Sequence, residues 1–324
     1  MKIKQQIAAR LRQAERPFLI CHFSPDGDAL GSMLGLTLTL QKMGKNPDAA
    51  CQDPVPPIYR YLAGAHQVIS QPRHEYDLVI SLDCSDMRRM GTPYQTLSFQ
   101  NNAMPIINID HHVTNINFGE LNWVDPEAAA TAEIVLELIE GLGVPLDADV
   151  ATNLLTGIVT DTRGFRTSNT SPQVMAAATK LMQAGANLAD ITTKVFSRRP
   201  LAAVRLWAQA LAEINLDGRI LWSVVTQEMR EKSNCNHDGD AGLVSFLGDV
   251  NEADIAVIFT ERETGKIDVG MRASAGWNVA QVALSLGGGG HPRAAGCTLE
   301  TTLDKAINIV LPALQASWQE QAGY

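Results

Sequence analysis

Residues 106–112 of the chain are IINIDHH, a short apolar and β-branched run that ends in an acid and two adjacent imidazoles. Two other apolar runs end in a similar way, since residues 18–21 lead into HFSPDGD and residues 78–82 lead into DCSD. Amphipathic stretches separate the runs, which is the pattern of a parallel sheet with crossover helices. Ligands of open α/β sheets bind beyond the carboxyl ends of the strands. We therefore expect the three polar clusters to meet at one edge of the sheet.

The remainder of the chain predicts a helical completion of this domain and then a second, smaller α/β domain. Helical spacing recurs at residues 129–142, 150–159, 172–184 and 188–196. Residues 197–200, SRRP, interrupt it, because proline disfavours helix for the residue before it and begins a new helix well. Strands are expected at residues 219–225, 254–260, 266–271 and 295–299, with helices at 277–286 and at the C-terminal end. The expected division is residues 1–196, a linker at 197–205, and residues 206–324.

Composition narrows the function class. A chain of 324 residues with 45% hydrophobic content suits two globular cores. Because the start lacks a long apolar signal region and no segment approaches about 18 apolar residues, we expect a cytoplasmic protein without membrane contact. The five scattered cysteines indicate neither a disulfide framework nor a zinc knuckle. A net charge of −9 argues against long nucleic acid, whose binding depends on many Lys and Arg contacts, so a phosphate-bearing substrate should be small.

Four clusters carry candidate metal ligands. They are His22, Asp26 and Asp28 after the first strand, Asp83 after the second, Asp110, His111 and His112 after the third, and Asp161 at the end of an apolar helical run. Taken singly, Asp-Gly is a turn signal, Asp28 an ordinary helix N-cap and Asp161 a surface residue. Taken together, carboxylates and imidazoles at several strand ends suit two divalent ions of the Mn²⁺ kind. Two such ions about 4 Å apart assist phosphoryl displacement.

The second domain contributes a glycine run at residues 287–290, followed by His291 and Arg293. Glycines allow the backbone to approach a phosphate or carboxylate closely. Arg272, at the end of a predicted strand and followed by Ser274, is suited to bidentate recognition of a phosphate. Taken singly, the glycine run is a flexible loop and Arg272 is a solvated charge.

These motifs, in this order and over nearly the whole chain, resemble those of the DHH/DHHA1 phosphoesterase superfamily, and within it the nanoRNase and pAp-phosphatase branch of bifunctional oligoribonucleases. The matching segments are HFSPDGD at 22–28, SLD at 81–83, DHH at 110–112, TDT at 160–162 and GGGGHPRAAG at 287–296. The resemblance implies a parallel-sheet DHH domain with helices on both faces, a smaller α/β DHHA1 domain that binds substrate, and a cleft between them.

The resemblance also implies roles for single residues. His22, Asp26 and Asp83 are expected to hold one Mn²⁺ ion, and Asp28, Asp83, His111 and Asp161 the other, with Mg²⁺ or Co²⁺ as alternatives. Asp83 then bridges the ions, and His112 faces the scissile phosphate as a catalytic residue. The expected substrate-binding residues are Arg272, Ser274, His291, Gly289, Gly290 and Arg166, the last beside Phe165.

Two positions depart from the family pattern. Glycine is expected directly after Asp-Thr in the fourth motif, but Arg163 stands there and Gly164 follows it. The segment before the helix of the second domain is Gly-Trp-Asn-Val at residues 276–279, where the family often has Asp-Val-Asn. Neither departure involves an expected metal ligand.

The expected reaction is hydrolysis of RNA of two to five nucleotides to mononucleotides, and of adenosine 3′,5′-bisphosphate (pAp) to AMP, by hydroxide activated by two metal ions. Linear dinucleotides such as pApA or pGpG are alternative substrates, and a non-catalytic nucleotide-binding module is the alternative of a different class. A RecJ-like exonuclease would need a further module and a basic channel, and a family II inorganic pyrophosphatase would lack the glycine-histidine loop. The oligomeric state stays open, with a homodimer among the expectations.

Overall fold

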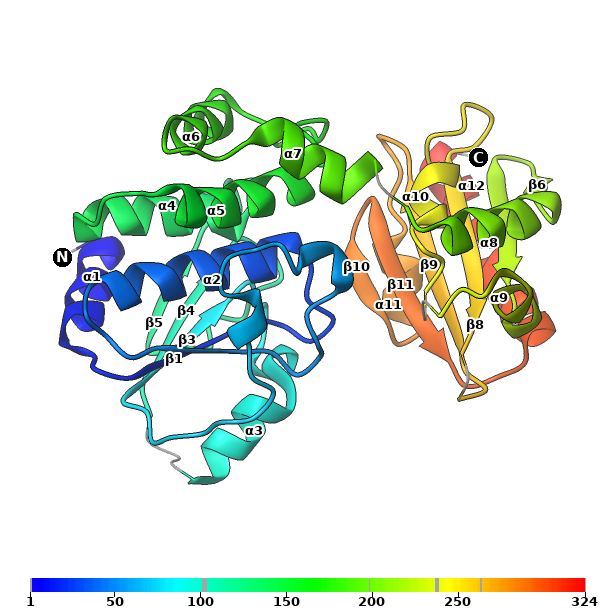
Figure 1. The fold of residues 1–324 in the computed structure, drawn as a ribbon. Helices are drawn as coiled ribbons and strands as arrows, with labels where there is room; N and C mark the ends of the chain where they lie inside the picture. Colours follow the sequence, from blue (N-terminus) through cyan, green and yellow to red (C-terminus); the bar gives the residue numbers. More distant parts are fainter. Residues whose placement is uncertain (1, 101–103, 198, 237–238, 263, 324) are drawn as a thin grey trace. The chain divides into compact units, whose positions relative to one another are not determined.

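The computed structural model describes the chain except at residues 1, 101–103, 198, 237–238, 263 and 324 (Figure 1). The chain divides into two compact units, residues 1–198 and 199–324. Each unit has its own sheet and its own hydrophobic cores. The segment expected as a linker, residues 197–205, includes the beginning of helix α8 (Leu201–Ala212), which belongs to the second unit.

The first unit is built on a five-stranded sheet in the order β2-β1-β3-β4-β5, and every pair of neighbouring strands is parallel. The strands are β1 (Pro17–Ile20), β2 (Asp48–Ala50), β3 (Leu78–Leu82), β4 (Ile106–Asp110) and β5 (Leu121–Val124). The three strands expected from their apolar runs are β1, β3 and β4, so the parallel α/β fold is confirmed. The sequence did not indicate β2, which has three residues, or β5, which contains a polar Asn122.

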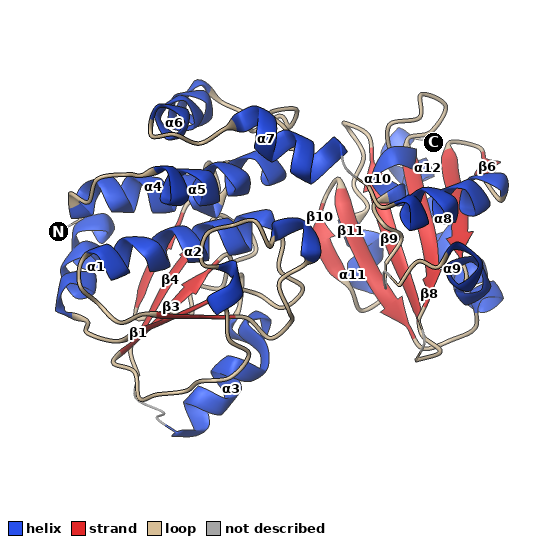
Figure 2. Cartoon of the chain, viewed as in Figure 1, coloured by secondary structure: helices blue, strands red, loops and turns tan. Residues whose placement is uncertain are grey.

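Helices cover both faces of this sheet, as Figures 1 and 2 show. The helices are α1 (Ile3–Gln13), α2 (Gly27–Lys42), α3 (Gly91–Gln100), α4 (Thr131–Leu142), α5 (Ala148–Asp161), α6 (Pro172–Gln183) and α7 (Leu188–Thr192), which continues as a π-helical turn (Thr193–Ser197). Short 3-10 turns lie at Pro57–Tyr59, Ala65–Gln67 and Met87–Met90. Leu19 packs in the core under α2 and α4, whereas Phe18 and Ile20 pack with Leu97 of α3. Such burial on both faces explains why the strands are continuously apolar.

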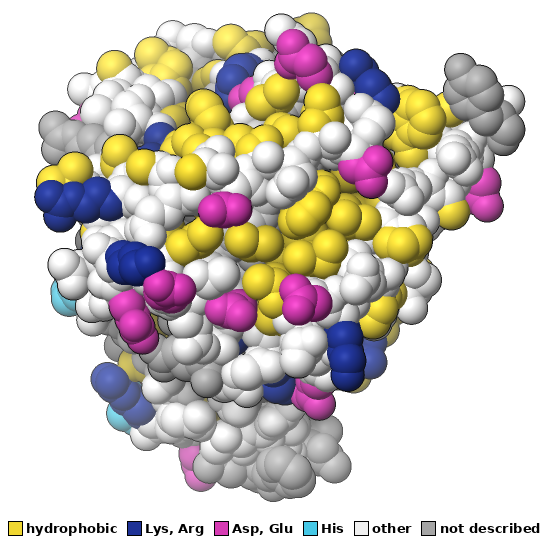
Figure 3. Space-filling view, turned by 90° about the vertical axis from the view of Figure 1, so that its right-hand side faces the viewer, with side chains coloured by type: hydrophobic (Ala, Val, Ile, Leu, Met, Phe, Trp, Pro, Cys, Tyr) yellow, Lys and Arg dark blue, Asp and Glu magenta, His cyan; other side chains and the backbone are white. Residues whose placement is uncertain are grey.

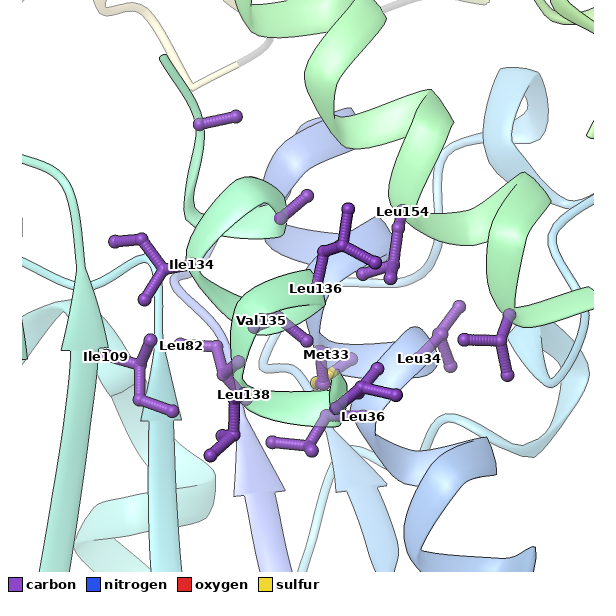
Figure 4. Close-up of a cluster of buried hydrophobic side chains, with 14 of the residues drawn as sticks. Met33, Leu34, Leu36, Leu82, Ile109, Ile134, Val135, Leu136, Leu138 and Leu154 are labelled. Atoms are coloured by element: carbon purple, nitrogen blue, oxygen red, sulfur yellow. The ribbon is translucent and has the colours of Figure 1, made fainter. Parts of the chain in front are cut away.

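Helices α2 and α5 approach each other closely through glycines spaced four residues apart. A Cβ atom at Gly31 would lie 2.4 Å from the carbonyl oxygen of Asn153, and one at Gly35 would lie 2.8 Å from the side chain of Leu154. Around this contact the side chains of α2, α4 and α5 pack together above the strands (Figure 4). The close packing brings the first turn of α2, with Asp28, near the last residue of α5, Asp161.

The second unit holds a six-stranded mixed sheet in the order β10-β11-β9-β8-β7-β6, in which only β7 and β8 are parallel among the described pairings. Its strands are β6 (Asn215–Asp217), β7 (Ile220–Val225), β8 (Ile255–Glu261), β9 (Ile267–Ala273), β10 (Gly289–His291) and β11 (Ala294–Leu299). Its other helices are α9 (Gln227–Ser233), α10 (Leu243–Leu247), α11 (Ala280–Ser285) and α12 (Leu303–Ala322). Helices α11 and α12 contribute to one core, and α8 and α10 to the other.

Two expectations for this unit need correction. The glycine run is not wholly a loop, because Gly289 and Gly290 pair with β11 as part of β10. The expected helix at residues 277–286 is shorter, since α11 begins only at Ala280, after a connection that follows β9. In the part of the chain that the structure describes, no helix has the length and apolarity needed to span a bilayer.

Candidate active site

The polar clusters that follow β1, β3 and β4 do meet at the carboxyl edge of the first sheet. His22 follows β1, Asp83 follows β3, and His111 follows β4. The Nε2 atom of His22 lies 3.5 Å from Oδ2 of Asp83, and the Nε2 atom of His111 lies 3.7 Å from Oδ1 of the same carboxylate. Asp83 thus presents one oxygen to each of two histidines, which is the arrangement of a carboxylate between two ligand sets.

Asp83 is held tightly in this position. Its side chain is 2% exposed, and its Oδ1 atom accepts a hydrogen bond of 2.9 Å from the hydroxyl of Thr131. Its backbone has a φ of 60°, a left-handed conformation that is rare for an aspartate outside turns and functional sites. The strand end therefore adopts a strained backbone that turns this carboxylate into the cluster.

The first group of potential ligands consists of His22, Asp26 and Asp83, whose donor atoms lie within 4.8 Å of one another. The Nδ1 atom of His22 lies 2.8 Å from the carbonyl oxygen of Phe23, so the Nε2 atom is the one near Asp26 and Asp83. Asp26 is the N-cap of α2, where its Oδ1 accepts from the amides of Asp28 and Ala29. This corrects the reading of Asp28 alone as the cap, because Asp28 lies inside the helix.

The second group consists of Asp28, His111 and Asp161. The Nε2 atom of His111 lies 3.2 Å from Oδ2 of Asp161 and 4.0 Å from Oδ2 of Asp28. Asp28 is fully buried and accepts from the amides of Thr131 and Ala132 at 2.6 and 2.9 Å. These amides begin α4, where the partial positive charge of a helix N-terminus stabilises a carboxylate.

His112 lies beside these groups, and its Nδ1 atom is 3.6 Å from Oδ1 of Asp83 and 2.7 Å from Oδ1 of Asp110. Asp83, His111 and His112 therefore form a third set of close donor atoms. Asp110 is fully buried, and it belongs to none of the three sets among the described residues.

Neighbouring carboxylates strongly raise the pKa values of two of the histidines. Burial lowers the pKa of His22, but the hydrogen bond to Asp83 and the charges of Asp26 and Asp83 outweigh it and raise this pKa to about 9. Burial likewise lowers the pKa of His111, whereas Asp161, Asp83 and Asp28 raise it to about 11. The clustered negative charge thus favours the protonated form of both imidazoles.

The pKa values of the carboxylates shift in opposite directions, according to the neighbours of each one. Burial and the charges of nearby acids raise the pKa of Asp28, and burial raises that of Asp161 to about 6 despite the hydrogen bond with His111. Burial also acts to raise the pKa of Asp83, but the hydrogen bond with His22 and the charges of His112 and His111 lower it well below its ordinary value. Several acids packed in one buried place are costly unless cations compensate them.

The donor set fits divalent metal ions. Carboxylate oxygens suit hard divalent cations, and imidazole nitrogens suit the transition metals among them. Buried acids and histidines with donor atoms this close are what such a site requires, so the structure supports a metal-binding site at this edge of the sheet.

The remaining predicted residues lie on both units. Arg166 follows α5 in the first unit, is exposed, and donates through Nε to the carbonyl oxygen of Arg163. In the second unit, Arg272 of β9 and His291 of β10 both pair with Ala294 of β11, so they flank the same position of the sheet. Gly289 and Gly290 adjoin His291 on β10, and the hydroxyl of Ser274 donates to the carbonyl oxygen of Ala253.

The two departures from the family pattern also have a structural outcome. Arg163, Gly164 and Phe165 have φ values of 50°, 74° and 65°, so the loop after α5 is left-handed at three successive residues. Arg163 adopts there the backbone conformation that a glycine would adopt without steric cost. At the second departure, the ring of Trp277 stacks on Trp318 of α12, with the ring centroids 5.3 Å apart.

Sequence reasoning missed Thr131, although it contacts Asp83 through its hydroxyl and Asp28 through its amide. The sequence marks it only as a threonine near the start of the helical run at residues 129–142, two residues before Glu133. The partners of Thr131 lie 48 and 103 residues away in the chain, so no local pattern could reveal them.

Known protein families match both units of the chain. Residues 17–158 match the DHH family, N-terminal domain, and residues 219–316 match the DHHA1 domain. The chain belongs to the DHH phosphoesterase family. It is 36% identical to the bifunctional oligoribonuclease and PAP phosphatase NrnA of Thermus thermophilus, over 98% of this chain and 95% of that protein. It is 28% identical to the Bacillus subtilis protein of the same name, over 86% of this chain and 87% of that protein.

A solved structure shows the same fold. The exopolyphosphatase-related protein from Bacteroides fragilis is 23% identical and superposes with a TM-score of 0.90, covering 99% of this DHH chain and 97% of its own. The family and the assignment to the phosphoester hydrolases, both predicted from the motifs, are confirmed.

Proposed function

We propose that this DHH protein hydrolyses RNA of two to five nucleotides to mononucleotides and pAp to AMP. The observation that carries the proposal is the buried group of histidines and aspartates at the edge of the first sheet, with Asp83 between two histidines. Support for the substrates comes from the relatives named oligoribonuclease and PAP phosphatase, one of which matches almost along its whole length. Linear dinucleotides such as pApA and pGpG are the second class of substrate to test.

Two divalent ions, Mn²⁺ before Mg²⁺ or Co²⁺, are part of the proposal. His22, Asp26 and Asp83 would hold one ion, and Asp28, Asp83, His111 and Asp161 the other. Bound there, the ions supply positive charge for the attacking and leaving oxygens of phosphoryl displacement. The imidazole ligands favour Mn²⁺ over Mg²⁺, which prefers oxygen ligands.

His112 acts on the substrate in this proposal. Its Nδ1 atom is engaged by Asp110, which sets the plane of the ring. Burial lowers the pKa of His112, but the hydrogen bond to Asp110 and the charges of Asp83 and Asp110 raise it above its ordinary value. The protonated imidazole that these charges favour donates a hydrogen bond to a phosphoryl oxygen and stabilises negative charge as it develops.

In this proposal the second unit also binds the substrate. Arg272, Ser274 and His291 bind its terminal phosphate, and Gly289 and Gly290 let the backbone come close to it.

The charge of the chain explains why the substrate is short. The chain carries a net charge of −9, and on the face drawn in Figure 3 the described Lys and Arg side chains are interspersed with Asp and Glu and do not merge into one basic area. Binding of long nucleic acid needs many such contacts.

The test is a substrate panel with labelled RNA dinucleotide and trinucleotide, a 24-mer, pApA, pAp and pyrophosphate, each with Mn²⁺ and with EDTA. We expect Mn²⁺-dependent turnover of the short RNAs and of pAp, and its loss in Asp83→Ala. Asp86→Ala is the matched control, because Asp86 caps the next 3-10 turn and lies outside the three ligand sets. Preference for pyrophosphate or the 24-mer would contradict the proposal, and binding without any turnover would indicate a nucleotide-binding module.

A further inference from the structure

A chain of asparagine side chains lies behind His112. Asn115, in the loop after β4, donates through Nδ2 to Oδ2 of Asp110 at 2.6 Å and to the carbonyl oxygen of Cys84 at 2.9 Å. Its Oδ1 atom accepts from Nδ2 of Asn108 at 2.9 Å and from the amide of Asn117 at 2.7 Å. Both ends of the Asn115 amide group are therefore engaged, and its orientation is fixed.

Asn108 anchors this arrangement in the sheet. It is fully buried within the otherwise apolar strand β4, where a polar side chain is costly unless it is hydrogen-bonded. Its Nδ2 atom donates to Asn115 and, at 3.3 Å, to Asn122 of the neighbouring strand β5, whereas its buried Oδ1 atom has no hydrogen-bond partner among the described residues. Asn122 is in turn bonded to both the amide and the carbonyl oxygen of Gly119. The asparagine at this strand position thus supports Asn115 from the rigid interior.

Asp110 receives the other end of the chain. One carboxylate oxygen accepts from Asn115, and the other faces the amide of His111 at 2.9 Å and Nδ1 of His112 at 2.7 Å. A carboxylate held at both oxygens has a fixed plane, and that plane determines the direction in which the His112 ring points. The loop bearing Asp83 is joined to the same point through the carbonyl oxygen of Cys84.

We propose that Asn115 is a positioning residue for phosphoester hydrolysis, because it fixes the carboxylate of Asp110 and thereby the imidazole of His112. The inference rests on the proposed function for the role of His112. Among the described contacts, Asn115 bonds to Asp110 and to the carbonyl oxygen of Cys84 but to no carboxylate assigned as a metal ligand. We therefore expect its loss to change the orientation of His112, and Mn²⁺ binding is measured beside kcat because Cys84 adjoins Asp83.

The test variant is Asn115→Asp, which keeps the size of the side chain and the Oδ1 acceptor but replaces both donors with an oxygen that repels Asp110. With pAp and an RNA dinucleotide we expect kcat to fall about 10- to 100-fold, the range for residues that orient ligands, while KM changes less than about threefold. Asn115→Ser retains one donor and should give an intermediate kcat, which keeps the test valid if Asn115→Asp folds poorly.

Asn153→Asp is the matched control. Asn153 is fully buried in the same unit, and its amide group bonds to both backbone polar atoms of Ala63 at 3.0 and 3.1 Å. The substitution removes a donor to a backbone carbonyl, as Asn115→Asp does, but far along the chain from Asp110. It should lower the unfolding temperature and leave kcat of the folded enzyme unchanged.

A double-mutant cycle with Asp110→Asn distinguishes positioning from a structural role. If Asn115 acts through Asp110, the double variant is no slower than Asp110→Asn alone, because the two effects are not additive. Additive losses of kcat would overturn the inference, as would a kcat of Asn115→Asp within about threefold of wild type or a proportionate loss of Mn²⁺ binding.

The spectroscopic readout does not depend on turnover. With ¹⁵N-labelled histidine and Mg²⁺-loaded protein, we expect the Nδ1 proton of His112 to give a resolved NMR signal in wild type and in Asn153→Asp. The signal is assigned by its disappearance in His112→Gln. We expect it to shift or broaden in Asn115→Asp. An unchanged signal overturns the positioning role even where the wild type hydrolyses every substrate of the panel, and a changed signal upholds it even if that panel shows no turnover and the proposed function fails.

Discussion

The two units hold their candidate functional residues in different ways. At the sheet edge of the first unit, Asp28 and Asp83 are buried and accept hydrogen bonds from the first turn of α4. In the second unit, Arg272 is half-buried and His291 is exposed on the strands of a mixed sheet. Buried charges require permanent partners. The difference supports the proposal that the first unit carries out the chemistry and that the second unit contributes affinity for the substrate.

The largest expected effect is at Asp83. Asp83→Asn keeps the shape of the side chain but removes the negative charge that lies between His22 and His111. We expect kcat to fall at least about 1,000-fold, or about 4 kcal/mol of lost transition-state stabilisation. Stopped-time assays on pAp and an RNA dinucleotide with Mn²⁺ measure it. Turnover within tenfold of wild type would show that Asp83 is not essential for the reaction.

Proton release on metal binding is the next test of the buried site. A ligating imidazole must lose its proton, and in the metal-free cluster the pKa of His22 is raised to about 9 and that of His111 to about 11. Mn²⁺ therefore displaces protons, and its affinity should rise with pH up to about 9, where His22 loses its proton, and further toward about 11 for His111. Calorimetry in two buffers of different ionisation enthalpy counts the protons. Identical heats in both buffers would show that the histidines bind no metal.

Arg272→Lys tests whether the second unit contributes affinity for the phosphate of the substrate. Loss of a bidentate contact to phosphate costs about 1.5 to 3 kcal/mol, so we expect KM for pAp to rise about 10- to 100-fold with kcat nearly unchanged. Arg219→Lys is the control, because Arg219 is an exposed arginine of the same unit that pairs with Asp254. A fall in kcat without a change in KM would place Arg272 with the chemistry instead.

Thr131→Val should have the smallest of these effects. It preserves the shape of the side chain and the backbone amide that holds Asp28, but removes the hydrogen bond to Asp83. We expect Mn²⁺ affinity or kcat to fall about tenfold. Thr37→Val is the control, since Thr37 is also buried and its hydroxyl donates to the carbonyl oxygen of Met33 in its own helix. Equal Mn²⁺ affinity and equal kcat in the two variants would show that Thr131 does not contribute to the site.

Sequence patterns predicted the parts of the fold that local physics determines. The apolar runs of β1, β3 and β4 and the acids at their ends follow from burial on both faces of a parallel sheet. Strand β10 was missed because glycine has low strand propensity, and only pairing with β11 makes it a strand. Thr131 and Asn115 were missed because their function is a contact with a residue elsewhere in the fold, and no local pattern encodes such a contact.

The most direct measurement is a titration of Mn²⁺ into the metal-free protein while hydrolysis of an RNA dinucleotide and of a 24-mer is followed in parallel. We expect no turnover without metal, dinucleotide hydrolysis that reaches its plateau at two ions per chain, and almost no hydrolysis of the 24-mer. Metal-independent hydrolysis, a plateau at one ion, or preference for the 24-mer would contradict it.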